Sequence, residues 1–583
     1  MSGASWNEDK SSAEGNQRVP ATASDTPVRV AGGGESGRGR SAQYRAVLVV
    51  GILALWLVFA LYVALCLLET EGHLTLASDD AYITMCVARN FAHDGTWGIE
   101  PGHFASLVSS PAWVLLMAGI FRLVGAAEWV PLAMNLFWAT ALIVLIWAIL
   151  RSFRVHPLAA LVGLFMALFL TPIIPVAFTG LEHMLQMSVD LAYLFAAGLV
   201  LGNDAPPAQK RPAALALLLL SPFVTLVRYE GMFLIAVGGG VLLARKQVRL
   251  GLLTAALGAL PVVASGLIFL HKGWFFFPTT LLQKGNFRQS STLWEYIVRL
   301  AGSVFAALHD ASDSVRQATG AHLGVLLGLV LLACLYRSVP MFASRLGVMC
   351  ALFFGTALLH LEFARLGSFY RYEAYLVCIG LVLFVLLGAG LEWKPPRLGK
   401  AMPGWISAAS LAIALVLLME PLWDRAVNAY DDTPLASRNI WEQQYQMGHF
   451  LHRYYEGASV ALNDIGAVNY FARIHCCDLE GLANTTVKRL VEKRLYDTST
   501  IRELARSQDA RVALLYESWF YSFGGLPAEW SKAAIWTIPD NRVCGGPRVT
   551  FYAVDPAELS PLRSHLEEFT NELPGSVYVR IYR

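Results

Sequence analysis

The feature that most constrains this chain is a run of 23 residues, 46–68, that contains no charged side chain. A membrane-spanning helix needs about 20 such residues to cross the roughly 30 Å of bilayer hydrocarbon. The run is too long for the apolar region of a cleaved signal peptide, so we expect it to remain as an anchor. Arg38, Arg40 and Arg45 precede it, and the positive-inside rule then places the N-terminus in the cytoplasm.

Further apolar segments recur along the chain and indicate a polytopic α-helical membrane protein. Of its 583 residues, 56% are hydrophobic and 15% are charged, whereas soluble domains are roughly 45–50% apolar and about 25% charged. The hydropathy pattern predicts about 11 transmembrane helices, in the segments 46–68, 129–150, 157–178, 184–201, 213–227, 231–244, 251–271, 321–336, 341–359, 372–391 and 404–420.

Residues 111–121 are apolar but too short to count as a span. At about 1.5 Å per residue, a helix of this length crosses only about half of the hydrocarbon. We therefore place it in the membrane interface, within one long extracytoplasmic loop, 69–128. With this choice every loop assigned to the cytoplasm carries Lys or Arg, whereas counting 111–121 as a span would invert that distribution.

Two regions outside the spans have a different character from the transmembrane domain, 45–420. Residues 1–44 are rich in Gly, Ser and charge, which predicts a disordered cytoplasmic tail. Residues 421–583 alternate short apolar runs with charged residues, which predicts a soluble extracytoplasmic α/β domain with its own core. We expect strands at 458–463, 510–516 and 549–554 and a helix at 484–507. Trp519, Tyr521 and Trp530 could contact an acceptor glycan or form the core of this domain.

Several classes of function are disfavoured by composition. The formal net charge of +2 and the lack of a basic stripe with interleaved aromatics exclude nucleic acid as a partner. The eight cysteines show no CxxC spacing and no pattern of His partners, so we expect no zinc site. Cys476, Cys477 and Cys544 lie in the predicted extracytoplasmic domain, where one disulfide could form.

Two adjacent carboxylates, Asp79 and Asp80, follow the first span. Such a pair is costly to keep near lipid, and groups of this kind usually bind something or accept a proton. The alternative is that they only cap the helix that follows, since Asp is a favoured N-cap. A cap needs only one of them, so we interpret the pair as part of a catalytic site.

The predicted topology brings other polar residues of the outer loops to the same face as this pair. Arg and Lys bind phosphate, and a nearby carboxylate can take a proton from an attacking hydroxyl. This combination at a membrane surface suits the transfer of a sugar from a lipid-phosphate carrier. No GxxxxGK[ST] or GxGxxG motif for a nucleotide is present. The residues concerned are Arg89, Glu182, Arg228, Glu230, Lys284, Arg371 and Tyr372.

A family resemblance is carried by the segment after the first span. Its Asp-Asp-Ala-Tyr-Ile at 79–83, Ala-Arg-Asn-Phe-Ala at 88–92 and Gly-Thr-Trp-Gly at 95–98 resemble the first extracytoplasmic loop of GT-C membrane glycosyltransferases. The group of the mycobacterial terminal β-1,2-arabinofuranosyltransferase is the most similar. Shorter matches with the same order and sidedness follow at 179–182, 228–231, 278–284, 371–372, 463–467 and 478–483.

The resemblance implies a polyprenyl-phosphate sugar donor, inversion at the anomeric carbon and a first-loop Asp as general base. By motif match that base is Asp79, with Asp80 as the alternative. Arg228, Lys284 and Arg371 would bind the donor phosphate. Glu182 and Glu230 would position the sugar or an arginine, and Arg89 and Tyr372 belong to the same donor-binding motifs. His-Phe-Ala at 103–105 departs from the family pattern, which leaves the sugar and the acceptor open.

These expectations together describe an inverting enzyme of a bacterial inner membrane. Its acceptor would be a hydroxyl of an envelope glycan, glycolipid or glycoprotein. We expect no metal or cofactor, because basic residues could neutralise the leaving phosphate, although a divalent metal stays an alternative. A transporter or flippase of lipid-linked sugars is the rival hypothesis, but no paired half-sequences are evident and the charges gather on one face. A sensor domain on a scaffold of spans would leave those charges without a role.

Overall fold

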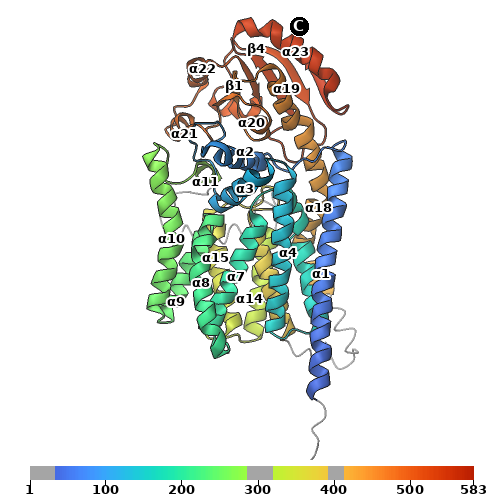
Figure 1. Cartoon of the computed structure of the whole chain (residues 1–583), viewed down its shortest axis with the longest axis vertical. Coiled ribbons are helices and arrows are strands. Elements are labelled where there is room, and N and C mark those ends of the chain that lie inside the picture. The colour runs from blue at the N-terminus through green and yellow to red at the C-terminus, as the bar shows by residue number, and fades with distance from the viewer. Residues whose placement is uncertain (1–32, 285–319, 391–412) are drawn as a thin grey trace, which may run out of the picture.

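The computed structural model describes residues 33–284, 320–390 and 413–583. A bundle of apolar helices forms one end of the elongated molecule and a sheet with its flanking helices forms the other (Figure 1). Two helices of the first long loop, α2 (Asp79–Asp94) and α3 (Pro111–Val124), lie between these two parts. The end of the bundle that carries them is called the domain-facing end below.

The bundle consists of helices with the length and composition of membrane spans. Among the residues that the structure describes, six helices are long and apolar enough to cross a bilayer, and five others are apolar but shorter. The chain is therefore a polytopic α-helical membrane protein, as predicted. Its bundle helices are α1 (Gly33–Glu69), α4 (Trp129–Ser152), α5 (Pro157–Leu170), α6 (Ile173–Phe178), α7 (His183–Leu201), α8 (Pro207–Val227), α9 (Gly231–Ala244), α10 (Val248–His271), α14 (Ala321–Tyr336), α15 (Arg345–Phe363) and α16 (Ala374–Ala389).

Most of the predicted spans coincide with these helices, and two differ. The segment predicted at 157–178 is divided into α5 and α6 at Pro172, because proline cannot donate the main-chain hydrogen bond that would continue a helix. The segment predicted at 404–420 lies mostly outside the described residues, although 413–418 are helical. Residues 111–121, predicted to be an interfacial helix, fall within α3 at the domain-facing end (Figure 1).

A long helical segment joins the bundle to the sheet. It begins with α18 (Glu420–Ile440), continues through one π-helical segment, η1 (Trp441–Tyr445), and ends with α19 (Gln446–Tyr454). The side chain of Arg438 reaches back to Glu69 at the end of α1, with 3.0 Å between guanidinium and carboxylate. The Tyr62 hydroxyl donates to the Tyr430 carbonyl at 3.2 Å. Helix α18 therefore packs along α1. This part of the chain was predicted to be the start of the soluble domain.

The sheet contains six strands in the order β2-β1-β3-β5-β4-β6. Strand β1 pairs in parallel with β2 and with β3, whereas the other three pairings are antiparallel. The part of the chain at 459–581 that includes these strands is called the sheet domain. Its strands are β1 (Ser459–Leu462), β2 (His475–Asp478), β3 (Val512–Leu515), β4 (Ser531–Thr537), β5 (Arg548–Ala553) and β6 (Tyr578–Ile581).

The α/β character predicted for this region is confirmed, with corrections in detail. The three predicted strands correspond to β1, β3 and β5, whereas β2, β4 and β6 were not predicted. The helix predicted at 484–507 is two helices, α21 (Thr485–Glu492) and α22 (Thr498–Ser507), because Asp497 caps α22 through a capping box. The disulfide suggested for this region is absent, since all eight cysteines are free thiols.

Helix α2 connects the bundle to the sheet domain through two charged side chains that hold α20 (Ala467–Phe471). The Asp79 carboxylate accepts hydrogen bonds from the backbone amides of Gly466 and Ala467, at 2.8 and 2.7 Å. Arg89, on the same side of α2, donates to the carbonyls of Asn469, at 3.3 Å, and Tyr470. Free amides at a helix start attract negative charge and free carbonyls at its end attract positive charge. The two side chains therefore clamp α20 at both ends.

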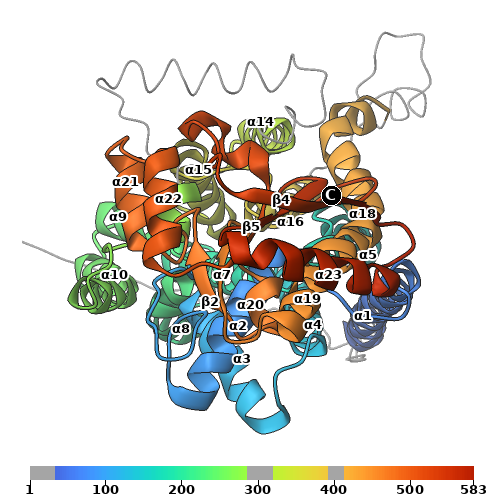
Figure 2. The ribbon, with the colours of Figure 1, turned by 90° about the horizontal axis from the view of Figure 1, so that it is seen from above.

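The view from above shows the result of this docking. The sheet domain covers the middle of the bundle, with α20 over α2, while α1 and α10 lie at opposite edges (Figure 2). Ser78, and neither aspartate, is the N-cap residue of α2. The helix-cap hypothesis for the aspartate pair is thus wrong for α2 itself.

We expect Gly466→Ala to loosen the docking of the sheet domain. A Cβ atom at this position would lie 2.2 Å from both the carbonyl oxygen and a carboxylate oxygen of Asp79, so one of the two segments must move. Overpacking of this kind costs about 1–3 kcal/mol. Thermal unfolding in detergent should show a lower midpoint, and limited proteolysis should release the sheet domain faster. Gly575→Ala is the matched control because a Cβ there meets no atom within 4 Å. Equal stability of the two variants would contradict the clamp.

Candidate active site at the domain-facing end of the bundle

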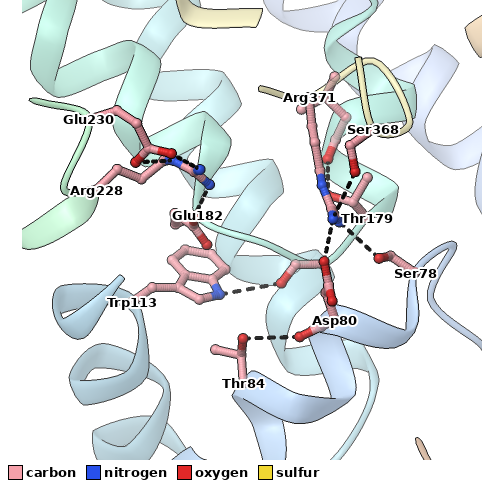
Figure 3. Close-up of polar contacts among 12 residues, drawn as sticks. Ser78, Asp80, Thr84, Trp113, Thr179, Glu182, Arg228, Glu230, Ser368 and Arg371 are labelled. Atoms are coloured by element: carbon pink, nitrogen blue, oxygen red, sulfur yellow. Dashed lines mark hydrogen bonds and ion pairs between the residues drawn. The ribbon is translucent and has the colours of Figure 1, made fainter. Parts of the chain in front are cut away.

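Asp79 and Asp80 are consecutive residues in the first turn of α2, so their side chains leave the helix about 100° apart. Asp79 is directed to the sheet domain, as described above. Asp80 is directed to the bundle, where its carboxylate forms an ion pair with Arg371 (Figure 3). The side chain of Asp80 is 30% exposed and that of Arg371 is 5% exposed. The pair that looks equivalent in sequence therefore has two different surroundings.

The position of Arg371 is determined by several hydrogen bonds. Its guanidinium donates to the Ser78 hydroxyl at 2.8 Å and to the Ser368 hydroxyl at 3.3 Å, in addition to the Asp80 carboxylate (Figure 3). Ser78 directly precedes α2, so the guanidinium bridges the start of α2 and the segment between α15 and α16. This bridge fixes where the Asp80 carboxylate lies.

Arg371 follows a turn with unusual backbone geometry. Four consecutive residues, Gly367 to Tyr370, have positive φ angles of 78°, 48°, 55° and 61°. Three of them carry side chains, for which this conformation costs roughly 1–2 kcal/mol per residue. Such strain persists only when the surrounding structure holds it, and it is concentrated at functional sites.

A buried charge network holds this turn. The Glu373 carboxylate accepts from the Gly367 amide at 2.8 Å and lies 3.1 Å from both the Arg425 guanidinium and the His322 ring. Arg425 in turn donates to the Tyr370 carbonyl. Both ends of the strained turn are thus tied to one buried carboxylate, which satisfies its charge inside the protein.

A second arginine cluster lies on the other side of the same region. The Arg228 guanidinium forms ion pairs with Glu182, at 2.6 Å, and with Glu230, at 2.5 Å (Figure 3). Glu182 directly precedes α7, while Arg228 and Glu230 lie in the tight connection of α8 and α9. The Tyr372 ring lies 5.7 Å from the guanidinium of Arg228 and 5.3 Å from that of Arg371. Tyr372 therefore contacts both cationic groups.

The two arginine clusters border one small polar cavity of about 430 Å³, called the central cavity. Asp80, Glu182, Arg228, Arg371 and Tyr372 all line it, together with hydroxyl groups of the first loop. Since carboxylates and guanidinium groups face the same space, the cavity can hold a group that combines phosphate with hydroxyls.

An apolar cavity of about 860 Å³ adjoins the central cavity. Ser109, Arg228, Thr280 and Tyr372 line both spaces. The remaining wall is largely hydrophobic and lies between α9, α15 and α11 (Thr279–Lys284). It includes Met232, Phe233, Phe277, Leu281 and Phe363.

Two further cavities open on Asp80 from the side of the sheet domain. The larger, of about 1190 Å³, is called the interdomain cavity and lies between α11 and the loops of the sheet domain. The other, of about 860 Å³, is lined by Asp79, Asp80, Arg371, Asp464 and others. Of these four cavities, Asp80 thus lines three: the central cavity, the interdomain cavity and the cavity that also contacts Asp464 and Arg371. Asp79 lines only the last of these three.

The residues singled out from sequence divide into three groups. Asp80, Glu182, Arg228, Arg371 and Tyr372 surround the central cavity, and Glu230 lines the apolar one. Asp79 and Arg89 hold the sheet domain through α20. Lys284 ends α11, and its side chain lies outside what the structure describes.

Other residues of the site were not found from sequence. Ser78, Ser368 and Arg425 have no motif that marks them, because single hydroxyls and a lone arginine carry no pattern, and Thr280 lies in the match at 278–284 without having been singled out. Within 33–284, 320–390 and 413–583, no three His, Cys, Asp or Glu side chains come together in a way that could hold a metal ion.

Burial affects the titration of Asp79. Desolvation together with the neighbouring carboxyl of Asp464 raises the pKa of Asp79 well above its usual range, although the amide of Ala467 opposes this shift. Asp464 itself accepts from the Gln444 amide at 2.9 Å and the Tyr516 hydroxyl at 3.3 Å. Asp79 therefore loses its proton at a higher pH than an exposed aspartate does, and once ionised it repels the Asp464 carboxylate.

Comparison with known proteins gives the following similarities. Residues 438–552 match a family model described as a domain of unknown function, DUF8728. No curated protein sequence matches the chain. Among solved structures, the chain is similar to ArnT from Cupriavidus metallidurans bound to undecaprenyl phosphate, with 13% identity over 86% of this chain and 98% of that one and a TM-score of 0.49.

Two other solved structures are similar to the chain. The Archaeoglobus fulgidus oligosaccharyltransferase in its apo form has 14% identity over 88% of this chain and 74% of that one, with a TM-score of 0.48. The mycobacterial arabinofuranosyltransferase AftD has 14% identity over 86% of this chain and 41% of that one, with a TM-score of 0.41.

We expect Asp464→Asn to stabilise the protein at neutral pH. Because the pKa of Asp79 is raised on folding, its contribution to stability is present at low pH and is lost as the pH rises through the raised pKa. An asparagine removes the repulsion and can donate to Asp79, a gain of about 1 kcal/mol. Thermal unfolding at pH 5 to 8 should show the gain at pH 7–8 and a smaller one at pH 5. The exposed Asp509 provides the control Asp509→Asn. A variant that tracks wild type at every pH would refute the coupling of these carboxyls.

Proposed function

We propose that the chain is an inverting glycosyltransferase of the GT-C type, which moves a pentosyl or hexosyl group from a polyprenyl phosphate to an acceptor hydroxyl. The observation that carries this proposal is the position of Asp80, between a polar cavity that continues into an apolar one and an open space beneath the sheet domain. A donor with an isoprenoid chain, a phosphate and a sugar needs an apolar space, cations and hydrogen-bonding groups in that order.

The donor would place its isoprenoid chain in the apolar cavity and its phosphate near Arg228 and Arg371. Both guanidinium groups face the central cavity, and arginine binds phosphate through its planar fork. Glu182 and Glu230 hold Arg228 from two sides. This pairing satisfies a buried cation before the substrate arrives, and it orients the guanidinium.

We assign the role of general base to Asp80 in place of Asp79, the residue preferred from the sequence motif. Asp79 is engaged with two backbone amides of the sheet domain, and Asp80 faces the cavities. The acceptor oxygen would attack the anomeric carbon and give its proton to Asp80 as the bond between that carbon and the phosphate oxygen breaks. Attack from the side opposite the phosphate inverts the anomeric configuration.

The reaction would occur at a bacterial inner membrane, with the domain-facing end and the sheet domain outside the cytoplasm. This placement follows from the positive residues of the opposite loops. The cytoplasmic position of residues 1–44 and the roles of 45–420 and 421–583 as catalytic and acceptor-facing parts belong to the same proposal. The acceptor is an envelope glycan, glycolipid or glycoprotein.

We expect Asp80→Asn to abolish sugar transfer and Asp79→Asn to reduce it much less. Loss of a general base lowers kcat by about 10²–10⁴-fold, whereas Asp79→Asn weakens the docking of the sheet domain. Membranes that contain each variant would be incubated with isotopically labelled polyprenyl-phosphate sugars. Transfer of the labelled sugar to the acceptor would be followed by mass spectrometry. Asp94→Asn, at the exposed end of α2, is the control. Full activity of Asp80→Asn would exclude the assigned base, and full activity of both aspartate variants would exclude the reaction class.

The apolar cavity leads to a second expectation about chain length. Leu281 lines the apolar cavity, and the adjacent Leu282 lines the interdomain cavity. Leu281→Trp should therefore raise KM by about tenfold for a donor with a full-length isoprenoid chain, and little for a short-chain analogue. Leu282→Trp should leave both donor KM values unchanged, which makes it a matched control of equal size. Equal responses of the two variants would show that the isoprenoid chain lies elsewhere.

A further inference from the structure

The interdomain cavity is the largest space that opens on Asp80, at about 1190 Å³. One wall comes from the bundle side and includes Asp80 and Gln283, while the other wall comes from the sheet domain. An extended ligand could thus reach Asp80 while most of its length contacts the sheet domain.

The wall from the sheet domain is built by three corresponding loops. Asn463 and Asp464 follow β1, Glu480 follows β2, and Trp519 follows β3. These three strands are parallel neighbours. Loops beyond the carboxyl ends of parallel strands are the usual place for ligands in open α/β sheets. The edge of the sheet domain formed by the loops after β1, β2 and β3 therefore faces Asp80 across the cavity.

The side chains of this edge suit a ligand that is rich in hydroxyl groups. Carboxylates and amides accept and donate hydrogen bonds, and the aromatic rings of Tyr496, Trp519 and Phe523 offer apolar surface. The Trp519 indole N–H already donates to the Gly545 carbonyl at 3.0 Å, which fixes the ring in place. A sugar presents both hydroxyl groups and C–H faces, so it matches this combination.

Glu480 lines the cavity, and its backbone is hydrogen-bonded to both parts of the molecule. Its amide donates to Asp478 at 2.8 Å, and its carbonyl accepts from Gln283 of α11 at 3.3 Å. Burial and the neighbouring Asp478 raise the pKa of Glu480 to about 7. Near neutral pH its carboxyl is therefore present in both protonation states, and it can donate to one hydroxyl or accept from another.

We propose that the interdomain cavity binds the acceptor as a carbohydrate chain, with its terminal hydroxyl at Asp80 and its preceding sugars along the loops after β1, β2 and β3. This inference rests on the proposed function only in taking the group at Asp80 to be the hydroxyl that accepts the sugar. A peptide acceptor is disfavoured, because this cavity lies at the ends of the strands, where an extended peptide cannot add to a strand edge.

The test is a binding titration of the full chain in detergent with octyl glycosides as probes. The probes are mono-, di- and trisaccharides of arabinofuranose, galactofuranose and mannopyranose, followed by saturation-transfer NMR. We expect at least one series to bind, with affinity that rises from one sugar to three. Trp519→Ala should weaken the trisaccharide at least tenfold, and Gln283→Ala should weaken it from the bundle side.

The matched control is Tyr521→Ala. Tyr521 belongs to the same 3-10 helix as Trp519, Glu517–Phe523, but it is 69% exposed and does not line the cavity. Its variant should bind like wild type. Thermal unfolding of each variant separates lost binding from lost folding, and Gln283→Ala provides a second test should Trp519→Ala not fold.

The outcomes separate this inference from the proposed function. If no glycoside binds, if Trp519→Ala and Gln283→Ala bind like wild type, or if only unglycosylated peptides bind, the carbohydrate site is refuted. Binding is measured in Asp80→Asn as well, where it should persist. Transfer that depends on Asp80 but ignores the cavity variants would refute the site and retain the enzyme. Glycoside binding without transfer from any polyprenyl-phosphate sugar would retain the site and refute the enzyme.

Discussion

Two side chains of opposite charge on α2 hold the sheet domain through its helix α20. Asp79 binds the free amides at the start of α20 and Arg89 binds the free carbonyls at its end. Each contact matches the partial charge at that end of the helix. The same helix carries Asp80 on another side, so the element that docks the domain also presents the carboxylate beneath it. The position of Asp80 in the wall of the interdomain cavity is therefore set by α2, because the same helix carries Asp80 and docks the sheet domain.

Charges elsewhere in the site are arranged before any substrate binds. Arg228 lies between two carboxylates, and Arg371 lies between Asp80 and two hydroxyl groups. Burial of unpaired charges would be prohibitive, and these pairs remove that cost. The strained turn before Arg371 is held at both ends by Glu373 and Arg425. The stability of the bundle thus maintains a local geometry that would be unfavourable in isolation.

The sequence allowed good prediction of features that depend on composition and long apolar runs. The spans, the helix at 111–121 and the α/β character of the C-terminal region belong to this group. Prediction was poorer where a tertiary contact decides the role of a residue. Adjacent residues such as Asp79 and Asp80 share every local signal, and only the docking of α20 distinguishes them. Short strands such as β2, whose His-Cys-Cys-Asp sequence lacks apolar alternation, depend on their neighbours in the sheet. Ser78 and Ser368 were invisible for the same reason.

The helix that joins the two parts of the molecule constrains how the chain can change. Along the α-helical parts of this segment, α18 and α19, the rise is about 1.5 Å and the rotation about 100° for each residue. Insertion of a single residue would therefore turn the sheet domain by more than a quarter of a revolution and separate α20 from α2. The π-helical segment at Trp441–Tyr445 accommodates one additional residue in its turn. An insertion or deletion in this helix would keep the sheet domain docked only if a π-helical turn formed or was lost at the same time. The length of the helix therefore determines the orientation of the sheet domain about the helix axis.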